Sequence, residues 1–296
     1  MSDERVPHDR RFRSGPPAIP SPGLPPVPDA LAGLLAGAPA EQTWVKPESE
    51  VWLVELSSGR AYLKIMDDLD PWIGEIDRLR WCVDHSPLPT PHVLGKAVDE
   101  LGRGWFVATE VVGTPSHDRA LVEHDADSLV CGLATGLRRF HDGIGVMADS
   151  SLVDCPFRLG VDDLIVRAQA RVAAGGVDPS QMLSVTYQRL SPERLLEQLV
   201  ETRPEEPAAD QVVTHGDPCQ PNLLVDPTSP EEMRLIGLVD LGRLAVTDRY
   251  RDLAIAARSL EMNVGNSAAA QFLETYGLDP LDEQRLEWWT LVDDMW

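Results

Sequence analysis

The sequence predicts an α+β fold in two parts: a small, strand-rich part over residues 29–111 and a larger, mostly helical part over residues 112–296. In the first part, short apolar runs are separated by turn residues, as is typical of strands. After Gly113, apolar residues recur at helical spacing, except in one strand-like hairpin within residues 212–243. Residues 1–28 are rich in proline and lack apolar periodicity, so we expect a disordered arm there.

The bulk composition indicates a globular chain with reduced thiols. Its 296 residues suffice for about two packed units of ~150 residues each. No apolar run approaches the ~20 residues of a membrane-spanning helix, and the N-terminus lacks the pattern of a signal peptide. The four cysteines are widely spaced and form no CxxC motif. We therefore expect a cytoplasmic protein that does not bind membranes, with free thiols.

The net charge of −22 limits the partners. A strongly acidic chain is unsuited to binding the phosphate backbone of nucleic acids, so we exclude that class. The charge favours a cationic partner, although an acidic surface that only keeps the protein soluble explains it equally well. Both readings stay open until the positions of the acidic residues are considered.

Each expected element follows from a local pattern. A short helix is expected from Asp29, its candidate N-cap, to Leu35. Beyond it, the strand-rich part is predicted to contain strands at Val51–Leu56, Ala61–Ile65, His92–Leu94 and Trp105–Glu110, and a helix at Trp72–Val83. The helical part is predicted to contain helices at Asp125–His141, Asp162–Ala174, Pro192–Glu201, Tyr250–Glu261, Asn266–Tyr276 and Asp282–Trp296.

Lys64 is a charged residue near the end of an apolar strand, in the segment AYLKI. A lysine there can simply protect a sheet edge from pairing with another strand. Glu75 lies on the first turn of the following helix, so the two side chains could also meet across a strand–helix contact. Such a pair would direct the ammonium group toward the phosphates of a nucleotide.

The hairpin within residues 212–243 concentrates the polar residues that carry chemistry. His-Gly-Asp at 215–217 and then Asn222 precede the run Leu223–Val225, and Asp240-Leu-Gly follows the run Leu235–Val239, with Pro227 and Pro230 in the turn. The hairpin would bring Asp217, Asn222 and Asp240 to one end. Their oxygens suit Mg²⁺, and Asp217 could instead accept a proton from an attacking hydroxyl. The alternative is that the three residues only cap turns.

The ordered set HGD, Asn and DLG resembles the catalytic loop and metal-binding motif of kinases, with HGD in place of HRD and DLG in place of DFG. Longer segments are more specific: VVTHGDPCQPNLLVD, GLVDLGRLAVTDRYRDLAIAARSLE, the CPF segment at 155–157 and the terminal LVDDMW. From about Trp44 to Trp296 they resemble the aminoglycoside phosphotransferases, most closely the 3′-phosphotransferases.

The resemblance implies a kinase-like fold of two lobes and a role for each matching residue. Asp217 matches the catalytic aspartate, and Asn222 and Asp240 match the Mg²⁺ ligands. The nucleotide-binding positions are matched by Lys64, Glu75, Ser49 in the phosphate-covering loop, and Thr109 and Val111 in the hinge that holds adenine through its backbone. The acceptor-binding positions are matched by Arg243, Arg258, Glu261, Asp293, Asp294 and the terminal carboxylate of Trp296.

Two positions depart from the family pattern. Glu50 follows Ser49 where the family has glycine, and a carboxylate there repels phosphate unless it is turned away. Met262 stands where many members have a glutamate that contacts the antibiotic, and Glu261 precedes it. The first departure bears on nucleotide affinity, and the second on the identity of the acceptor.

The resemblance therefore implies an ATP-dependent kinase that phosphorylates a hydroxyl of an aminoglycoside, the 3′-hydroxyl, and confers resistance. ATP with Mg²⁺ is the expected cofactor, and GTP is the alternative nucleotide. We expect a monomer or a weak homodimer. Two other functions stay open: a kinase of the same fold that acts on another antibiotic or a hydroxylated metabolite, and a non-catalytic nucleotide-binding relative.

Overall fold

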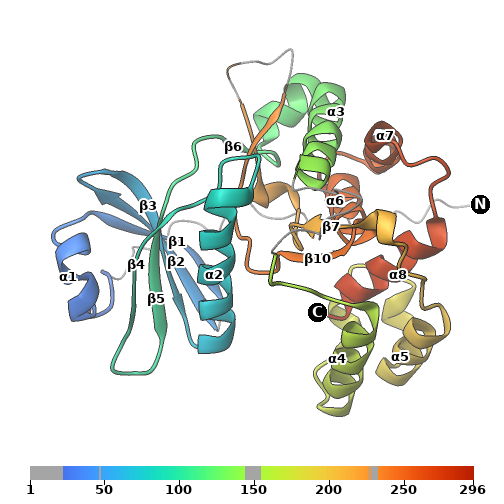
Figure 1. Ribbon diagram of the computed structural model, residues 1–296, viewed down its shortest axis with the longest axis horizontal. Coiled ribbons are helices and arrows are strands. Elements are labelled where there is room, and N and C mark those ends of the chain that lie inside the picture. Colours follow the sequence, from blue (N-terminus) through green and yellow to red (C-terminus); the bar gives the residue numbers. More distant parts are fainter. Residues whose placement is uncertain (1–22, 47, 144–154, 227, 229–232) are drawn as a thin grey trace, which may run out of the picture. The chain divides into compact units, whose positions relative to one another are not determined.

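The computed structural model describes residues 23–46, 48–143, 155–226, 228 and 233–296. Its contacts divide the chain into two compact units. The first contains the described residues up to Val83 and Thr90–Val112, and the second contains Asp84–Pro89 and Gly113–Trp296. Strands dominate the first unit and helices the second (Figure 1). The α+β class predicted from the sequence is confirmed.

A five-stranded antiparallel sheet forms the first unit, in the order β1-β2-β3-β5-β4. Its strands are β1 (Ala40–Lys46), β2 (Ser49–Leu56), β3 (Gly59–Met66), β4 (Val93–Val98) and β5 (Gly104–Thr109). The sequence reading missed β1. This strand lies at the sheet edge and is mostly exposed, so it lacks the apolar alternation that marks the other strands.

The two faces of this sheet are covered by different helices. Helix α1 (Asp29–Leu35) inserts Leu31 and Leu35 into the apolar cluster on one face. Helix α2 (Leu69–His85) lies on the opposite side of the sheet (Figure 1), where the indole ring of Trp72 packs over Gly104. Because side chains alternate along a strand, neighbouring residues of β3 point to opposite helices.

Two details at the start of the described chain differ from the sequence reading. Leu24 and Val27, which we placed in the disordered arm, pack against the cluster beneath α1. Residues 1–22 of that arm lie outside the described residues. Asp29 is the first residue of α1 and not its N-cap, because Pro28 occupies the cap position.

The second unit contains six α-helices in its described residues; all six were predicted, five of them to within two residues at each end. They are α3 (Arg119–Gly143), α4 (Val161–Ala173), α5 (Pro192–Glu201), α6 (Tyr250–Asn263), α7 (Asn266–Tyr276) and α8 (Glu283–Asp294). Helix α3 begins earlier than predicted but leaves helical geometry at Asp125, whose carboxylate accepts the Ser128 amide at 3.0 Å. The predicted start at Asp125 is therefore the start of its second, regular segment.

Two small sheets support the loops between these helices. Strand β7 (Gln211–Thr214) pairs with β10 (Ala245–Asp248), and β8 (Leu223–Val225) pairs with both β6 (Thr114–Pro115) and β9 (Leu235–Leu238). The hairpin of β8 and β9 was predicted, and its turn residues Pro227 and Pro230 lie outside the described residues. All four cysteines lie in the described residues, and none of them forms a disulfide. In the described part of the chain, no helix has the length and hydropathy that crossing a membrane requires.

Helix α3 crosses the β9 segment so closely that it requires glycine. A Cβ atom added at Gly132 would lie 1.7 Å from the carbonyl oxygen of Met233. We expect Gly132→Ala to lower the free energy of unfolding by about 1–3 kcal/mol, because this contact is with backbone that cannot rotate away. Gly33 lies at an exposed position of helix α1, and a Cβ atom added there would have no atom within 4 Å. Gly33→Ala should stabilise by about 0.5–1 kcal/mol through helix propensity. Denaturant unfolding measures the free energy of unfolding of both variants. If both substitutions stabilise the protein, or both destabilise it, the prediction is wrong.

Candidate active site

The His215-Gly216-Asp217 loop follows β7 directly and is hydrogen-bonded to Asp252 of helix α6. The backbone N–H groups of His215 and Gly216 donate to the two carboxylate oxygens of Asp252, at 2.6 and 2.9 Å. Gly216 has φ +90°, and a Cβ atom there would lie 2.2 Å from the carbonyl oxygen of Arg243. The loop therefore accepts only glycine at this position, and its path is fixed by buried hydrogen bonds.

Asp252 is completely buried, and its carboxylate contacts His141 in addition to the two backbone N–H groups. His141 Nε2 lies 3.0 Å from one of its oxygens, and His141 Nδ1 lies 2.7 Å from the hydroxyl of Tyr276. Burial raises the pKa of Asp252. The hydrogen bond and charge of His141, together with the charge of the nearby His215, lower the pKa by more than burial raises it, so the net shift is downward. The carboxylate is therefore ionised, which suits an acceptor of several hydrogen bonds.

The imidazole ring of His215 joins the two halves of the hairpin motif. Its Nδ1 accepts the backbone N–H of Asp217 at 3.3 Å, so Nε2 carries the proton and donates to the carbonyl of Val239 at 3.1 Å. Complete burial lowers the pKa of His215, which keeps the ring neutral in this tautomer. The loop that carries Asp217 is thereby tied to the residue that precedes Asp240.

Asn222 lies in the 3₁₀ turn Gln220–Asn222, which leads directly into β8. Its Nδ2 donates to the carbonyl of Asp217 at 2.9 Å and to Cys219 Sγ at 3.3 Å. Both bonds use the nitrogen of the carboxamide, so the oxygen points away from them. The backbone carbonyl of Asn222 also accepts the N–H of Val239 at 3.1 Å. The second unit thus assembles Asp217, Asn222 and the end of β9 in one compact region.

Asp240 is exposed and has φ 58°, a left-handed conformation that non-glycine residues adopt mainly at turns and functional sites. Its charge and that of Asp217 both act on Cys219: burial raises the pKa of the Cys219 thiol most, and these two carboxylates raise it further. The two carboxylates therefore share one neighbourhood, and both act on Cys219 in the same direction. Such a region favours a bound cation.

These residues fit a partly built Mg²⁺ site. Carboxylate and carboxamide oxygens are the ligands that Mg²⁺ prefers, and Asp240 with Asn222 offers one of each kind. Within the described ranges, no three or more His, Cys, Asp or Glu side chains gather as a metal-binding group. Two protein ligands of this kind would leave the rest of an ion's coordination sphere to waters and phosphates, as is usual for Mg²⁺.

The first unit brings Lys64 and Glu75 together. Lys64 Nζ lies 2.7 Å from Glu75 Oε2, and the two side chains are 18% and 7% exposed. The pair links β3 to α2 on the face of the sheet that α2 covers. Ser49 lies two residues before Val51, the cross-strand partner of Lys64, so Ser49 points to this same face.

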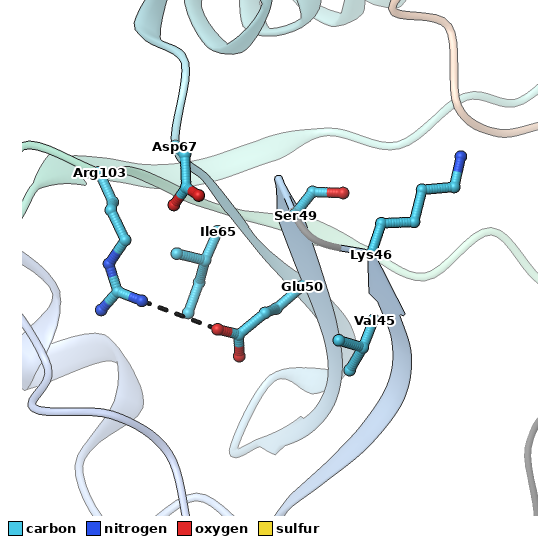
Figure 2. Close-up of a pocket in the computed structure, with 7 residues that line it drawn as sticks. All are labelled: Val45, Lys46, Ser49, Glu50, Ile65, Asp67 and Arg103. Atoms are coloured by element: carbon cyan, nitrogen blue, oxygen red, sulfur yellow. Dashed lines mark ion pairs between the residues drawn. The ribbon is translucent and has the colours of Figure 1, made fainter. Parts of the chain in front are cut away.

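Glu50 points to the other face, with Ile65 as its cross-strand partner. Its carboxylate accepts from Trp52 Nε1 at 3.2 Å and Gln42 Nε2 at 3.1 Å, and lies 3.7 Å from Arg103 Nη1. Figure 2 shows Glu50 directed toward Arg103 across a pocket of about 530 Å³. The pocket is lined by Val45, Lys46, Ser49, Glu50, Ile65, Asp67 and Arg103. The carboxylate is thus turned away from the face that carries Lys64.

The expected hinge residues occupy the end of β5 and the segment after it. The N–H of Thr109 donates to the carbonyl of His92 at 2.9 Å, and its Oγ1 accepts the N–H of His92 at 2.9 Å. The backbone N–H of Thr109 is therefore engaged within the sheet and does not point to an adenine edge. Val111 follows β5 in an irregular segment and is half-buried.

Four of the six expected acceptor residues line one pocket of about 270 Å³. Its lining comprises Arg171, Gly176, Val177, Asp178, Gln181, Leu183, Arg258, Asp293, Asp294, Met295 and Trp296. Arg258 on α6 forms ion pairs with both Asp293 and Asp294 on α8. The exposed residues Arg243 and Glu261 do not belong to this lining.

Sequence reasoning missed the residues that support the motif. Asp252, His141 and Tyr276 are buried partners far from the loop in the chain, and a single sequence shows only an acid in the first turn of a predicted helix. Cys219 was read only for redox state, although it contacts Asn222. Each of these contacts forms only through tertiary packing, so the sequence alone does not reveal it.

Comparison with known proteins adds the family. Residues 47–289 match the model of the phosphotransferase enzyme family. The chain belongs to this family. As a member, it is 34% identical over 225 residues to an aminoglycoside 3′-phosphotransferase of Streptomyces fradiae, covering 75% of this chain and 78% of the relative. It is also 34% identical over 230 residues to a streptomycin 3″-kinase of Streptomyces griseus, covering 75% and 79%.

Solved structures agree with the fold of this family member. A crystal structure of an aminoglycoside 3′-phosphotransferase of type VIII superimposes with TM-score 0.72 at 28% identity, over 90% of this chain and 98% of that chain. An aminoglycoside phosphotransferase of the 3″ type from Streptomyces rimosus gives TM-score 0.71 at 26% identity, over 90% and 96%. The predicted kinase-like fold is confirmed.

Proposed function

We propose that this phosphotransferase transfers the γ-phosphate of ATP to the 3′-hydroxyl of an aminoglycoside and thereby confers resistance to that antibiotic. The observation that carries the proposal is that part-buried hydrogen bonds join Asn222 to Asp217 and His215 to Val239, the residue before Asp240, in a chain whose relatives include aminoglycoside 3′-phosphotransferases. The net charge of −22 suits a cationic acceptor.

Each residue of the motif has a defined task in this reaction. Asp217 orients the acceptor hydroxyl and takes its proton as the phosphoryl group transfers. Lys64, held by Glu75, binds phosphate oxygens of the nucleotide. Asn222 and Asp240 would hold Mg²⁺, which when bound supplies positive charge to the phosphate oxygens. The protein's own contribution is positioning together with a fixed electrostatic environment.

A second candidate is phosphorylation of a 3″-hydroxyl, as in streptomycin. The streptomycin 3″-kinase of Streptomyces griseus matches this chain with the same 34% identity as the 3′-phosphotransferase of Streptomyces fradiae. The structural likeness to the 3″-type protein of Streptomyces rimosus points the same way. Met262 stands where the family resemblance implies a glutamate that contacts the antibiotic, so the acceptor contact at this position differs from the family pattern.

Acceptor profiling separates these functions. Purified protein with γ-labelled ATP is offered kanamycin, neomycin, a 3′-deoxy analogue of each, and streptomycin, and the phosphorylated position is mapped by NMR. Turnover of the 3′-hydroxyl drugs but not of their 3′-deoxy analogues is the expected result. Turnover of streptomycin alone would move the function to the 3″ type. Lack of labelled product with every aminoglycoside would overturn the proposal in favour of another acceptor or a non-catalytic role.

The orientation of Glu50 gives a prediction about nucleotide affinity. Because its carboxylate lies on the opposite sheet face from Lys64, we expect Glu50→Gln to change the KM for ATP by less than about threefold. Lys64→Ala, which removes a charge from the α2 face, should lower kcat/KM for ATP by about 10²-fold or more. Steady-state kinetics at saturating aminoglycoside measures both. A large gain in ATP affinity for Glu50→Gln would show that Glu50 repels phosphate after all.

A further inference from the structure

The two adjacent carboxylates at the end of α8 have different surroundings, although the sequence presents them as one acidic pair. Asp293 has a side chain that is 15% exposed and pairs with Arg258. The side chain of Asp294 is 1% exposed, and its Oδ1 accepts from Arg258 Nη1 at 2.7 Å. Both line the pocket of about 270 Å³, but they differ in what else they hold.

Asp294 also binds the main chain of a distant loop. The backbone N–H of Leu183 donates to its Oδ1 at 3.0 Å, and that of Ser184 donates to its Oδ2 at 3.2 Å. Both oxygens are thus engaged within the protein. Two backbone donors and one guanidinium group around a buried carboxylate are the partners that such a charge needs in order to be stable there.

The carboxylate of Asp294 binds the loop at Leu183 and Ser184, in a stretch whose apolar side chains are poorly buried. Met182 and Tyr187 are buried in the core of the second unit and fix the two ends of the stretch. Between them, Leu183 and Val185 are 43% and 56% exposed, so burial does little to hold the chain. Leu183 also lines the pocket, and the loop's position therefore sets the pocket's shape.

We propose that Asp294 is a positioning residue that fixes Leu183 and Ser184 to α8 and so shapes the acceptor pocket, a role distinct from the acceptor contact that the family resemblance implies for Asp293. This rests on the proposed function. Among its side chains, the pocket lining carries three carboxylates, Asp178, Asp293 and Asp294, against two guanidinium groups, Arg171 and Arg258. The surplus of one negative charge among these side chains suits a cationic ligand, and Asp293 is the partly exposed member of the α8 pair.

Asp294→Asn tests the positioning role, with Asp293→Asn as the matched control. The asparagine NH₂ faces one of the two backbone donors, so that hydrogen bond is lost. We expect amide hydrogen exchange at Leu183 and Ser184 to accelerate by about tenfold or more in Asp294→Asn and to stay at the wild-type rate in Asp293→Asn. The KM for the aminoglycoside should rise by about tenfold in both variants, with kcat reduced less than about threefold and the KM for ATP unchanged.

A second variant separates geometry from charge. Asp294→Glu keeps the charge and the pairing with Arg258 but moves the carboxylate, so exchange at Leu183 and Ser184 should still accelerate. A higher acceptor KM in Asp294→Asn with unchanged amide exchange would overturn the proposal, because Asp294 would then contact the acceptor itself. Faster exchange with an unchanged KM would also overturn it. If wild-type protein phosphorylates none of the aminoglycosides, the proposed function fails, whereas the exchange measurement still reports whether Asp294 holds the loop.

Discussion

Asp217→Ala is expected to lower kcat by about 10³-fold or more and to leave the Kd for ATP within about threefold of wild type. The loss follows because no other group of the His-Gly-Asp loop can take the acceptor's proton: His215 is buried, neutral and engaged at both ring nitrogens. Nucleotide binding persists because Lys64 and Glu75 belong to the other unit. Single-turnover kinetics gives the rate, and equilibrium titration gives the nucleotide affinity.

Asp226→Asn provides the matched control for this variant. Asp226 also follows a strand of the hairpin, but its carboxylate caps a turn by accepting from the N–H and hydroxyl of Thr228, at 2.8 and 2.7 Å. We expect its kcat to stay within about twofold of wild type. Asp217→Asn should resemble Asp217→Ala, since a carboxamide cannot accept a proton at neutral pH. A variant at Asp217 that keeps a tenth of the wild-type rate would sink the assignment.

Asp252→Ala is expected to lower the free energy of unfolding by about 3–5 kcal/mol, the largest stability change we predict. The substitution leaves two backbone donors, those of His215 and Gly216, buried without their acceptor, and it removes the charge that faces His141. Guanidinium unfolding followed by fluorescence measures the change. Because the same bonds shape the loop before Asp217, kcat should fall as well.

Asp142→Ala is the comparison for Asp252. Asp142 pairs with Arg138 at 2.6 Å and, at 3.7 Å, with the buried Arg249, but its own side chain is 49% exposed. An exposed ion pair contributes about 0–1 kcal/mol, since water replaces the lost partner. Equal destabilisation by Asp142→Ala and Asp252→Ala would show that the buried network does not support the loop.

The motif residues could be predicted because their chemistry is encoded locally. Asp217, Asn222 and Asp240 stand at fixed distances from two apolar runs, and a hairpin necessarily brings such flanking residues together. The meeting of Lys64 and Glu75 was predictable for a similar reason, since one strand and the helix after it are neighbours in the chain. Their roles in catalysis stay predictions until the variants are measured.

The supporting residues could not be predicted, because long-range packing determines them. His141 and Asp252 meet across 111 residues, and nothing in either local pattern indicates the other. The direction of Glu50 depends on strand register, where a shift of one residue reverses the face. The sequence does not distinguish the two carboxylates at the end of α8, yet Asp294 is buried and accepts hydrogen bonds from a loop more than 100 residues away in the chain.

The lack of space for a side chain at Gly216 bears on how the His-Gly-Asp loop can be regulated. Protein kinases carry an arginine at this position of the loop, and in many of them phosphorylation orders a nearby segment through arginine contacts. Here the carbonyl of Arg243 occupies the space that any side chain would need. An arginine switch cannot operate at this position, and the loop takes its shape from backbone hydrogen bonds that form as the chain folds. The shape of the loop therefore follows from the fold and does not depend on an arginine contact at this position.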